Sequence, residues 1–460
     1  MIRRASNAGT KLRSGPAMTA AIVRQIRNRG LRIAVIGCGY VGLSTAVLFA
    51  EVGYRVLGVD INARIVQQVA DGVCPMEEPG LPKMLLRNIR SGRLKLELAS
   101  KEALSGKQVF VIAVQTPIDR NKEPVLTHLM SAIAEVGEVM EKGALVLVCS
   151  TVPPRTMIER VMPKLESISG LKMDDGFYLA YAPERIAPGN TMEELVHGPR
   201  LVGGTTREST EIAARLLRTV CRRVIETDAT VAEVAKLAEN TFRDLNIAFA
   251  NYLALVCENL GIDAIEAMRL ANTHPRVDIH RPGPGVGGPC LPKDPYLLPQ
   301  LSKKNLVQTA RRLNDYMPEH VFELVCRGLK EANKKIENSK VVVLGSAYKR
   351  NVDDSRLSPS RRVIRRLLSS DAKVAIYDPH CKEDFGARRE NSLSDAVKDA
   401  DCVLIMVGHT EFETIRLKEV RQLMKASPLM VDGARIINPC GARRAGFRYL
   451  GIGLGARKAA

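Results

Sequence analysis

The sequence predicts an α/β protein with two doubly wound Rossmann-like domains, joined by a long central helix within a helical middle region. Three observations support this prediction. A β-branched strand runs into a glycine turn at 31–42, an uninterrupted helical pattern covers 230–260, and a second series of short apolar strands begins at 340. The chain has 460 residues, 45% of them hydrophobic, and this suffices for two or three domains with their own cores.

Residues 1–30 are expected to form a basic, disordered extension. Residues 1–32 contain eight arginines and lysines and no acidic residue, and so hold nearly half of the net charge of +18. A block of like charges is usually solvated, and Met18 is a possible alternative start. The stretch carries Arg and Ser like a transit peptide but lacks the apolar core of a secretory signal.

The first predicted domain, residues 31–215, opens with a βαβ unit. "LRIAVIG" is typical of a strand, "STAVLFAEVG" of a helix and "RVLGVD" of a second strand. Further strands end near residues 117, 151 and 184, with helical stretches between them. This alternation predicts one doubly wound parallel sheet.

The turn "GCGYVG" at 37–42 predicts a dinucleotide site. Its three glycines let the backbone approach a pyrophosphate at a helix N-terminus. Asp60 ends the next strand, where a carboxylate binds the adenosine ribose and repels a 2′-phosphate, so NAD is favoured over NADP. The expected cofactor contacts in this region are Gly37, Gly39, Tyr40, Val41, Gly42, Asp60 and Arg64.

Residues 216–325 are predicted to be the helical middle region. Apolar residues recur at helical spacing over 230–260, and no proline or glycine interrupts them before Gly261. Such a helix is about 45 Å long, so we expect it to link two domains or to pack on another subunit. Lys236 and Asn240 lie one turn apart on it, either as an active-site wall or as part of an exposed polar stripe.

One cysteine has an unusual context. The ten cysteines are scattered singly, without metal-site spacing, which favours free thiols in a reducing cytoplasm and no metal site. Cys290 follows "PGPGVGG", in which glycines leave room for a ligand and prolines restrict the loop. Lys293 favours a thiolate, and Asp294 is close in sequence. Because a turn-rich loop is a poor place for a core side chain, we expect a functional thiol.

The last predicted domain, residues 326–460, repeats the α/β alternation. Its strands are "KVVVLG", "KVAIYD", "DCVLIMVG" and "LMVDG". The first strand is followed by Gly345 but by no G-x-G-x-x-G motif. Lys349 and Arg356 either bind nucleotide phosphates at the strand ends or are solvated surface charges.

Composition argues against two classes of partner. No apolar run approaches the roughly 18 residues of a membrane-spanning helix, so no membrane partner is expected. The sequence has no zinc-finger spacing or basic–aromatic interleaving, and aromatic residues make up only 4% of the chain. The excess of positive charge therefore does not predict a nucleic-acid partner.

Motifs from about Leu31 to beyond Pro359 resemble the nucleotide-sugar 6-dehydrogenases, the UDP-glucose/GDP-mannose dehydrogenase family. They are "GCGYVG" with Asp60, "VQTP", "STVP", "PER", "AKLAENTF", "GPGVGGPCLPKDP" and "YKRNVDDSRLSP". The resemblance implies a cytoplasmic, NAD-dependent enzyme of polysaccharide biosynthesis that oxidises the C6 alcohol of a UDP-sugar to a carboxylate in two hydride transfers. It also implies a C-terminal UDP-sugar domain and a homodimer, or higher homo-oligomer, paired through the central helix.

The resemblance assigns roles to individual residues. Cys290 resembles the nucleophile, and Lys236 with Asn240 the group that stabilises the oxyanion. Asp294 and Glu184 resemble acid/base residues that act through water. The other implied contacts are Thr151 at the nicotinamide, Thr116 and Lys293 at the cofactor, and Arg185, His274, Arg276, Gly287, Lys349 and Arg356 at the UDP-sugar.

Four stretches resemble the family members that act on UDP-N-acetyl-D-mannosamine: "PERIAPG", "NTFRDLNIAFAN", "RLANTHPRV" and "PGPGVGG". Many glucose enzymes have a second glutamate where this chain has Pro188, although "CLPKD" is closer to the glucose enzymes. UDP-N-acetyl-D-mannosamine is therefore the expected substrate, with His274 and Arg276 reaching it from a partner subunit. The alternatives are UDP-glucose or UDP-N-acetylglucosamine, a single-step hydroxyacid dehydrogenase, and a non-catalytic nucleotide-sugar or nucleic-acid binding protein.

Overall fold

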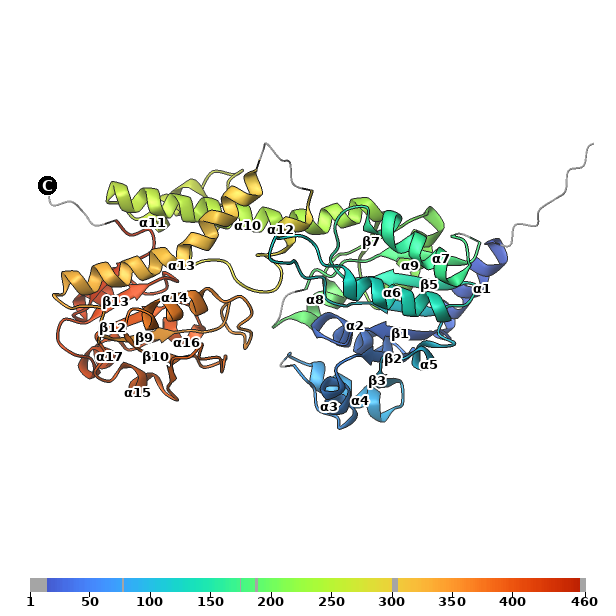
Figure 1. The fold of residues 1–460 in the computed structure, drawn as a ribbon, viewed down its shortest axis with the longest axis horizontal. Helices are drawn as coiled ribbons and strands as arrows, with labels where there is room; N and C mark the ends of the chain where they lie inside the picture. Colours follow the sequence, from blue (N-terminus) through green and yellow to red (C-terminus); the bar gives the residue numbers. More distant parts are fainter. Residues whose placement is uncertain (1–14, 77, 174, 187–188, 300–304, 456–460) are drawn as a thin grey trace, which may run out of the picture. The chain divides into compact units, whose positions relative to one another are not determined.

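The computed structural model describes residues 15–76, 78–173, 175–186, 189–299 and 305–455, shown as a ribbon in Figure 1. These residues form two compact units. Unit 1 contains the described residues up to Lys236 and Leu297–Pro299, and unit 2 contains Leu237–Tyr296 and the described residues after 304. The middle region predicted at 216–325 is therefore shared between the two units.

Unit 1 is built on an eight-stranded sheet. Its strands are β1 (Arg32–Ile36), β2 (Arg55–Asp60), β3 (Leu94–Leu98), β4 (Val109–Ile112), β5 (Ala144–Val148), β6 (Phe177–Tyr181), β7 (Arg200–Gly204) and β8 (Val224–Asp228), in the order β3-β2-β1-β4-β5-β6-β7-β8. All neighbours are parallel except β6 and β7. The prediction of a wholly parallel sheet is wrong at this pair, because β7 and β8 form a parallel pair of their own that joins the edge of β6 in reverse.

Helices cover both faces of this sheet. They are α1 (Gly15–Asn28), α2 (Tyr40–Glu51), α3 (Ala63–Ala70), α4 (Leu81–Arg90), α5 (Lys101–Leu104), α6 (Thr127–Val139), the π-helix η1 (Met157–Val161), α7 (Met162–Ser169), α8 (Thr191–His197) and α9 (Arg207–Leu217). On β1, Val35 packs in one core with α2 and α9, and Ala34 packs in another with α6 and α7. Burial on both faces confirms the predicted doubly wound fold.

Helix α1 lies in the extension that was expected to be disordered. Ile22 and Ile26, one turn apart, are buried in the core of unit 1, and the Thr19 hydroxyl is 2.9 Å from the hydroxyl of Tyr178. The prediction of disorder is therefore wrong for residues 15–28. It relied on the positive charge of the stretch and overlooked the apolar face of an amphipathic helix. The prediction for residues 1–14 lies outside the described residues.

The long helix was predicted correctly. Helix α10 (Ala229–Leu260) spans 32 residues without interruption, beginning in unit 1 and continuing in unit 2. It ends at Gly261, whose φ of +77° is a left-handed conformation that glycine adopts without steric penalty.

Unit 2 contains the second sheet, with all neighbouring strands parallel. The strands are β9 (Lys340–Leu344), β10 (Lys373–Tyr377), β11 (Arg388–Arg389), β12 (Cys402–Ile405), β13 (Leu429–Asp432) and β14 (Arg448–Gly451), in the order β11-β10-β9-β12-β13-β14. The helices are α11 (Ala264–Ala271), α12 (Asp294–Leu297, of which Leu297 belongs to unit 1), α13 (Leu306–Glu331), α14 (Pro359–Leu368), α15 (Leu393–Val397), α16 (Thr410–Glu413), α17 (Leu417–Leu423) and α18 (Pro439–Arg444).

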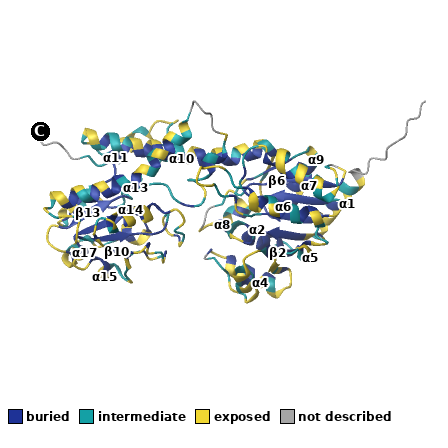
Figure 2. Cartoon of the chain, viewed as in Figure 1, coloured by how far each residue is buried: buried dark blue, intermediate teal, exposed yellow. Residues whose placement is uncertain are grey.

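The second sheet is also buried on both faces, as the dark strands of Figure 2 show. Val343 of β9 packs in a core with α13 and α14, and Val342 packs in another with α15, α17 and α18. The prediction of a second doubly wound domain is confirmed. Within the described ranges, no helix combines the length and hydropathy that a membrane span needs.

Candidate functional site

The glycine turn of unit 1 has the shape that a dinucleotide site requires. Gly37 has a φ of +87°, and a Cβ there would lie 2.8 Å from the carbonyl oxygen of Ala113. A Cβ on Gly42 would lie 1.8 Å from the Gly37 carbonyl oxygen. Gly39, by contrast, has no described atom within 4 Å of its Cβ position. The packed turn thus has no room for a side chain at Gly37 or Gly42, whereas Gly39 leaves space at the N-terminus of α2 for a ligand.

Asp60 lies at the carboxyl end of β2 and contacts this turn. Its Oδ2 accepts a hydrogen bond of 2.7 Å from the Cys38 N–H, and its Oδ1 accepts one of 2.9 Å from the Asn62 N–H. The residue is half-buried, so carboxylate lone pairs remain for a ribose hydroxyl. Arg64 is exposed in the first turn of α3. The described residues of the turn therefore fit an adenine dinucleotide such as NAD.

The Tyr40 side chain is held by the protein itself. Its hydroxyl donates to the buried carboxylate of Glu78 and is 3.0 Å from the Thr191 hydroxyl. Glu78 also accepts hydrogen bonds from the N–H groups of Gly189 and Thr191. Sequence analysis missed Glu78, which ties the cofactor turn to the chain that follows the "PER" motif.

Two predicted cofactor residues lie together where β4 and β5 end. The Thr116 hydroxyl donates a 2.6 Å hydrogen bond to the Thr151 carbonyl oxygen. A second bond of 2.7 Å, from the Ser150 hydroxyl to the Val114 carbonyl oxygen, joins the same two segments. The carboxyl edge of the sheet, where ligands of such folds bind, thus carries both threonines and the glycine turn.

Glu184 follows β6 and forms a buried ion pair. Its Oε2 lies 2.8 Å from an Nη of Arg200, whose side chain is only 4% exposed. The same nitrogen lies 3.8 Å from the Cys149 sulfur. Burial raises the pKa of the Cys149 thiol to about 12, so this cysteine is not a reactive thiolate. Arg185 is exposed and donates to the Pro199 carbonyl oxygen, while Pro188 lies outside the described residues.

Lys236 and Asn240 are buried side by side on α10, each only 7% exposed. The exposed face of the helix carries apolar side chains instead, including Phe242 and Phe249. The reading of Lys236 and Asn240 as an exposed polar stripe is therefore wrong. The Asn240 amide donates a 2.6 Å hydrogen bond to Oδ2 of Asp294, another predicted catalytic residue.

The Cys290 loop ends in a helical turn. The N–H groups of Lys293 and Asp294 donate to the Cys290 carbonyl oxygen at 2.9 and 2.8 Å. Asp294 begins α12 and is fully buried, and the Lys293 ammonium lies 3.3 Å from its Oδ1. Cys290 itself is exposed. The turn thus presents an accessible thiol beside a buried, hydrogen-bonded carboxylate.

The glycines before Cys290 allow close packing within unit 2. A Cβ on Gly287 would lie 2.7 Å from the Leu357 carbonyl oxygen, and one on Gly288 would lie 2.7 Å from the Tyr348 ring. The Gly288 N–H also donates to the Arg356 carbonyl oxygen at 2.9 Å. The Cys290 loop is thereby held against the segment that contains Lys349 and Arg356, which sequence reasoning did not foresee.

Arg356 and Lys349 lie on that segment, residues 345–359. The guanidinium of Arg356 is exposed and forms a two-pronged ion pair with Asp354, at 2.6 to 3.0 Å. Burial, together with the charges of Asp354 and Cys290, raises the pKa of Tyr348 to about 12. Lys349 is half-buried. The Arg356 backbone is thus hydrogen-bonded to the Cys290 loop through the Gly288 N–H.

A buried polar network supports the Cys290 loop and was not predicted. Arg311 of α13 pairs with Asp244 of α10 at 2.6 Å, and Asn314 donates to the same carboxylate. Asn251 donates to Asn314 and accepts from the Gly283 N–H, both at 2.9 Å. The available signal was the spacing of polar residues along α10, where Asn240, Asp244 and Asn251 interrupt an apolar helix on one face.

His274 and Arg276 lie after α11 and are both exposed. The Arg276 N–H donates to His274 Nδ1 at 3.3 Å. Their assignment to the substrate site stays a prediction.

Three family models match the chain. They describe the UDP-glucose/GDP-mannose dehydrogenase family: its NAD binding domain matches residues 31–221, its central domain 230–316 and its UDP binding domain 342–439. The UDP-N-acetyl-D-mannosamine dehydrogenase of Pyrococcus horikoshii is 41% identical to the chain over 428 residues, which cover 92% of this chain and 100% of that protein.

Solved structures are similar over the same extent. That of a UDP-D-ManNAc dehydrogenase from Pyrococcus horikoshii has a TM-score of 0.87 at 41% identity, with 93% of this chain and 100% of that chain covered. That of the UDP-N-acetyl-mannosamine dehydrogenase from Staphylococcus aureus has a TM-score of 0.81 at 38% identity, with 92% and 98% covered. The similarity therefore extends over both units.

Proposed function

The chain belongs to the UDP-glucose/GDP-mannose dehydrogenase family, an NAD-dependent enzyme family, and we propose that it oxidises the C6 hydroxyl of UDP-N-acetyl-D-mannosamine to the carboxylate, giving UDP-N-acetyl-D-mannosaminuronate. The observation that carries the proposal is the exposed Cys290 beside the buried pair of Asp294 and Asn240. The substrate is supported by the printed names of the similar proteins.

NAD, when bound, accepts one hydride in each of the two oxidations. In the first, the C6 hydroxyl loses its proton through water to Asp294 as the alcohol becomes an aldehyde. An aldehyde cannot give up its hydride to form a carboxyl derivative until a nucleophile has added to its carbonyl carbon. The Cys290 sulfur therefore bonds to the aldehyde carbon and forms a thiohemiacetal, whose oxidation gives a thioester.

The remaining residues act on oxyanions and water. Lys236 and Asn240 are donors on one face of α10, suited to stabilise the oxyanion of the thiohemiacetal. Glu184 removes a proton from the water that attacks the thioester carbon, the carbon–sulfur bond breaks, and the Cys290 thiol is restored. The balance is one alcohol, two NAD⁺ and one water giving one carboxylate, two NADH and three protons.

We assign the remaining contacts by the same reasoning. Thr151, Thr116 and Lys293 contact the cofactor, while Lys349 and Arg356 bind the diphosphate and Arg185 and Gly287 the rest of the UDP-sugar. The match of the UDP binding domain model to residues 342–439 supports the assignment of Lys349 and Arg356.

The proposal includes a cytoplasmic homodimer formed through α10. Phe242, Phe249 and Tyr252 are 48% to 59% exposed on the part of this helix in unit 2, and Leu270 of α11 is exposed as well. Large apolar side chains grouped on one helix are typical of a subunit interface. In such a dimer His274 and Arg276 contribute to the partner's substrate site.

The test is NADH formation over a panel of UDP-N-acetylmannosamine, UDP-N-acetylglucosamine, UDP-glucose and GDP-mannose. We expect the first to react with the highest kcat/KM and to yield two NADH per sugar. One NADH per sugar would contradict the two-step reaction, and preference for UDP-glucose would contradict the substrate.

Replacing Cys290 by Ala is expected to remove the thioester route. Net oxidation to the carboxylate should fall by at least about 10³-fold, because no other group supplies the nucleophile. Cys440→Ala is the matched control, since Cys440 is the other exposed cysteine of the described chain. If Cys290→Ala retained wild-type turnover and Cys440→Ala did not, the assignment of the nucleophile would be wrong.

A further inference from the structure

Unit 1 and unit 2 each contain the same backbone arrangement at the start of a nucleotide-binding turn. In unit 1 the last residue of β1, Ile36, pairs with Val59, and Asp60 follows. In unit 2 the last residue of β9, Leu344, pairs with Tyr377, and Asp378 follows. Asp378 therefore occupies in the second sheet the position that Asp60 occupies in the first.

The hydrogen bonds around these positions are also equivalent. Gly345 has a φ of +99°, and its N–H donates to the Tyr377 carbonyl oxygen at 3.0 Å, as the Gly37 N–H does to Val59 at 2.9 Å. The next N–H, of Ser346, donates to Asp378 Oδ2 at 2.6 Å, as the Cys38 N–H does to Asp60. Unit 2 thus has the turn without the G-x-G-x-x-G motif.

Asp378 differs from Asp60 in that it is fully buried and its oxygens accept more hydrogen bonds from the protein. Its Oδ2 accepts from the N–H groups of Ser346 and Ala347, and its Oδ1 accepts from those of His380 and Cys381. The His409 ring contributes a further bond, with Nε2 3.1 Å from Oδ2. These donors leave Asp378 no place for the ribose that the same position binds in unit 1.

His409 also has an equivalent in unit 1. Ile112 pairs with Ile36, and Ile405 pairs with Leu344, so the fourth residues after them, Thr116 and His409, correspond. Where unit 1 has a predicted cofactor contact, unit 2 has a buried imidazole. This position is thus predicted to contact a ligand in unit 1, whereas in unit 2 it forms hydrogen bonds within the protein.

The second ring nitrogen of His409 bonds to the segment after β9. The Asn351 N–H donates to His409 Nδ1 at 2.9 Å. Because this nitrogen accepts, the ring hydrogen is on Nε2 and is donated to Asp378. The imidazole therefore bridges the carboxylate and the middle of the 345–359 segment.

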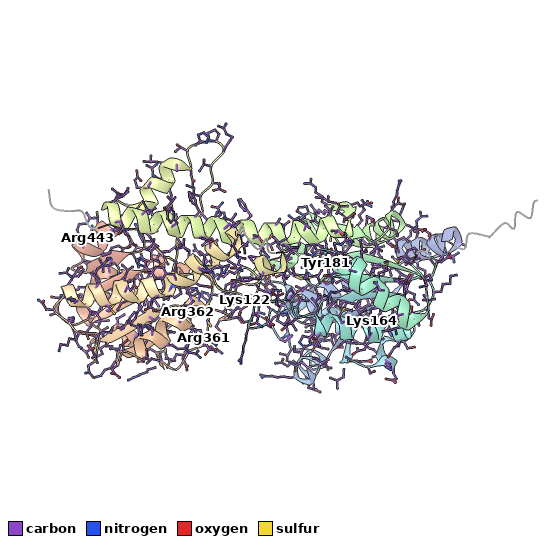
Figure 3. All side chains as sticks on the ribbon, turned by 45° about the horizontal axis from the view of Figure 1, so that its top comes forward. Lys122, Lys164, Tyr181, Arg361, Arg362 and Arg443 are labelled. Atoms are coloured by element: carbon purple, nitrogen blue, oxygen red, sulfur yellow. The ribbon has the colours of Figure 1, made fainter. Side chains whose placement is uncertain are left out.

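Thr410 fixes the same point of the segment. The Asn351 amide donates to the Thr410 hydroxyl at 2.8 Å, and the Thr410 N–H donates to the Asn351 amide oxygen at 3.1 Å. Asn351 has a left-handed φ of +55°, which these bonds hold in place. Lys349 lies two residues before Asn351, and Arg356 lies five residues after it. Both precede α14, on which Figure 3 labels Arg361 and Arg362.

We propose that His409 is a positioning residue for the UDP-sugar: by joining Asp378 to Asn351 it fixes the conformation in which the 345–359 segment presents Lys349 and Arg356 to the diphosphate. This inference rests on the proposed function, because it takes the binding of a UDP-sugar by unit 2 as given. His409 itself touches no ligand in this scheme.

Calorimetric titration of the full chain with UDP, and separately with NAD, tests the proposal. His409→Ala should weaken UDP binding by about tenfold or more, because it removes the two hydrogen bonds that join Asp378 to the segment, while NAD affinity in unit 1 stays the same. The KM for the UDP-sugar should rise more than kcat falls. His380→Ala is the matched control, because the His380 ring packs on His409 but bonds to Glu411 instead of the segment.

Thr410→Val keeps the test decisive if His409→Ala does not fold. Thr410 is exposed, so this variant removes the hydroxyl that accepts from the Asn351 amide and from Arg350 without opening the core, and the backbone bond from the Thr410 N–H to Asn351 remains. UDP binding should therefore weaken about threefold. The inference is overturned if either folded variant binds UDP like wild type, or if His409→Ala weakens NAD binding equally. A wild-type chain that neither binds UDP nor oxidises any UDP-sugar would instead refute the proposed function, and this inference with it.

Discussion

Cys290 and Asp294 are four residues apart in the chain but have opposite environments. The thiol is exposed, whereas the carboxylate is fully buried. A buried carboxylate is costly unless it is hydrogen-bonded or paired, and Asp294 has both Asn240 and Lys293 as partners. The turn that joins Cys290 to Asp294 thus places the proposed nucleophile and the proposed acid/base group at a fixed spacing, independent of any ligand.

Arg200 is a second residue whose environment leads to a prediction. It is buried with Glu184, so replacing it by Gln leaves a carboxylate in the interior without its cation. Breaking a buried pair in this way costs about 3 kcal/mol. We therefore expect Arg200→Gln to lower the free energy of unfolding by about that amount, measured by urea denaturation of the full chain.

The matched control is Arg207→Gln, which removes an exposed arginine paired with Glu211 and should change stability by less than about 0.5 kcal/mol. In the proposed mechanism Glu184 promotes thioester hydrolysis, so Arg200→Gln should also make a covalent adduct on Cys290 accumulate, visible by intact mass. Equal stability of the two variants would show that the Glu184–Arg200 pair contributes nothing measurable.

Between elements, Glu233 links α10 to the turn before the π-helix η1. Its carboxylate accepts hydrogen bonds from the N–H groups of Arg155 and Met157, at 2.5 and 2.9 Å. Arg155 has a left-handed φ of +69°, so the carboxylate stabilises a strained turn. Burial raises the pKa of Glu233 to about 7, against the opposing effect of these hydrogen bonds.

This raised pKa predicts the direction of a pH effect on stability. The folded pKa of about 7 exceeds the ordinary value of 4.5, so between these values the folded state binds more protons than the unfolded state. Glu233 therefore lowers the free energy of unfolding by roughly 1 kcal/mol per pH unit as the pH rises from 4.5 to about 7. Glu233→Gln abolishes this slope, whereas Glu211→Gln, at an exposed site, retains it.

Denaturation of the three proteins at pH 5.5 and pH 8 measures the effect. The stability of wild type relative to Glu233→Gln should be greater at pH 5.5 than at pH 8. The same difference at both pH values would show that Glu233 does not change its protonation in this range.

The apolar face of α10 predicts a change of assembly. Phe249→Asp places a charge among Phe242, Tyr252 and their neighbours, so it should weaken a dimer formed there by about 30-fold or more. Light scattering after size-exclusion chromatography measures the mass. Lys164→Asp, on the exposed surface of α7, is a control for added negative charge and should leave the mass unchanged. A wild-type monomer, or a Phe249→Asp dimer of unchanged strength, would refute the interface.

For the molecule as a whole, features set by residues close together in the sequence were predicted, whereas features set by contacts between distant residues were not. The glycine turn, Asp60 and the uninterrupted α10 were predicted because spacing alone determines them. Helix α1 and the reversed strand β7 were not, since tertiary packing overrides charge and pattern there. Glu78 and His409 were also missed, because each acts on segments more than 30 residues away along the chain.

The packing of glycines on Tyr348 predicts how each ligand affects the chain. UDP bound near Lys349 should slow amide hydrogen exchange in residues 345–359 and also in 283–290, because Gly287 and Gly288 contact the 345–359 segment directly. NAD should slow exchange in the 37–42 turn of unit 1 and leave 345–359 unchanged.

Gly288→Ala tests whether this packing carries the effect. Its Cβ would meet the Tyr348 ring at 2.7 Å, and its φ of +88° disfavours alanine, so the loop must move. We expect UDP still to protect 345–359 but no longer 283–290, with turnover reduced about tenfold or more because the Cys290 loop has lost its support. Gly283→Ala has no described atom within 4 Å of the added Cβ and should behave like wild type. Protection of 283–290 that persists in Gly288→Ala would mean that UDP reaches the Cys290 loop without the Tyr348 contact.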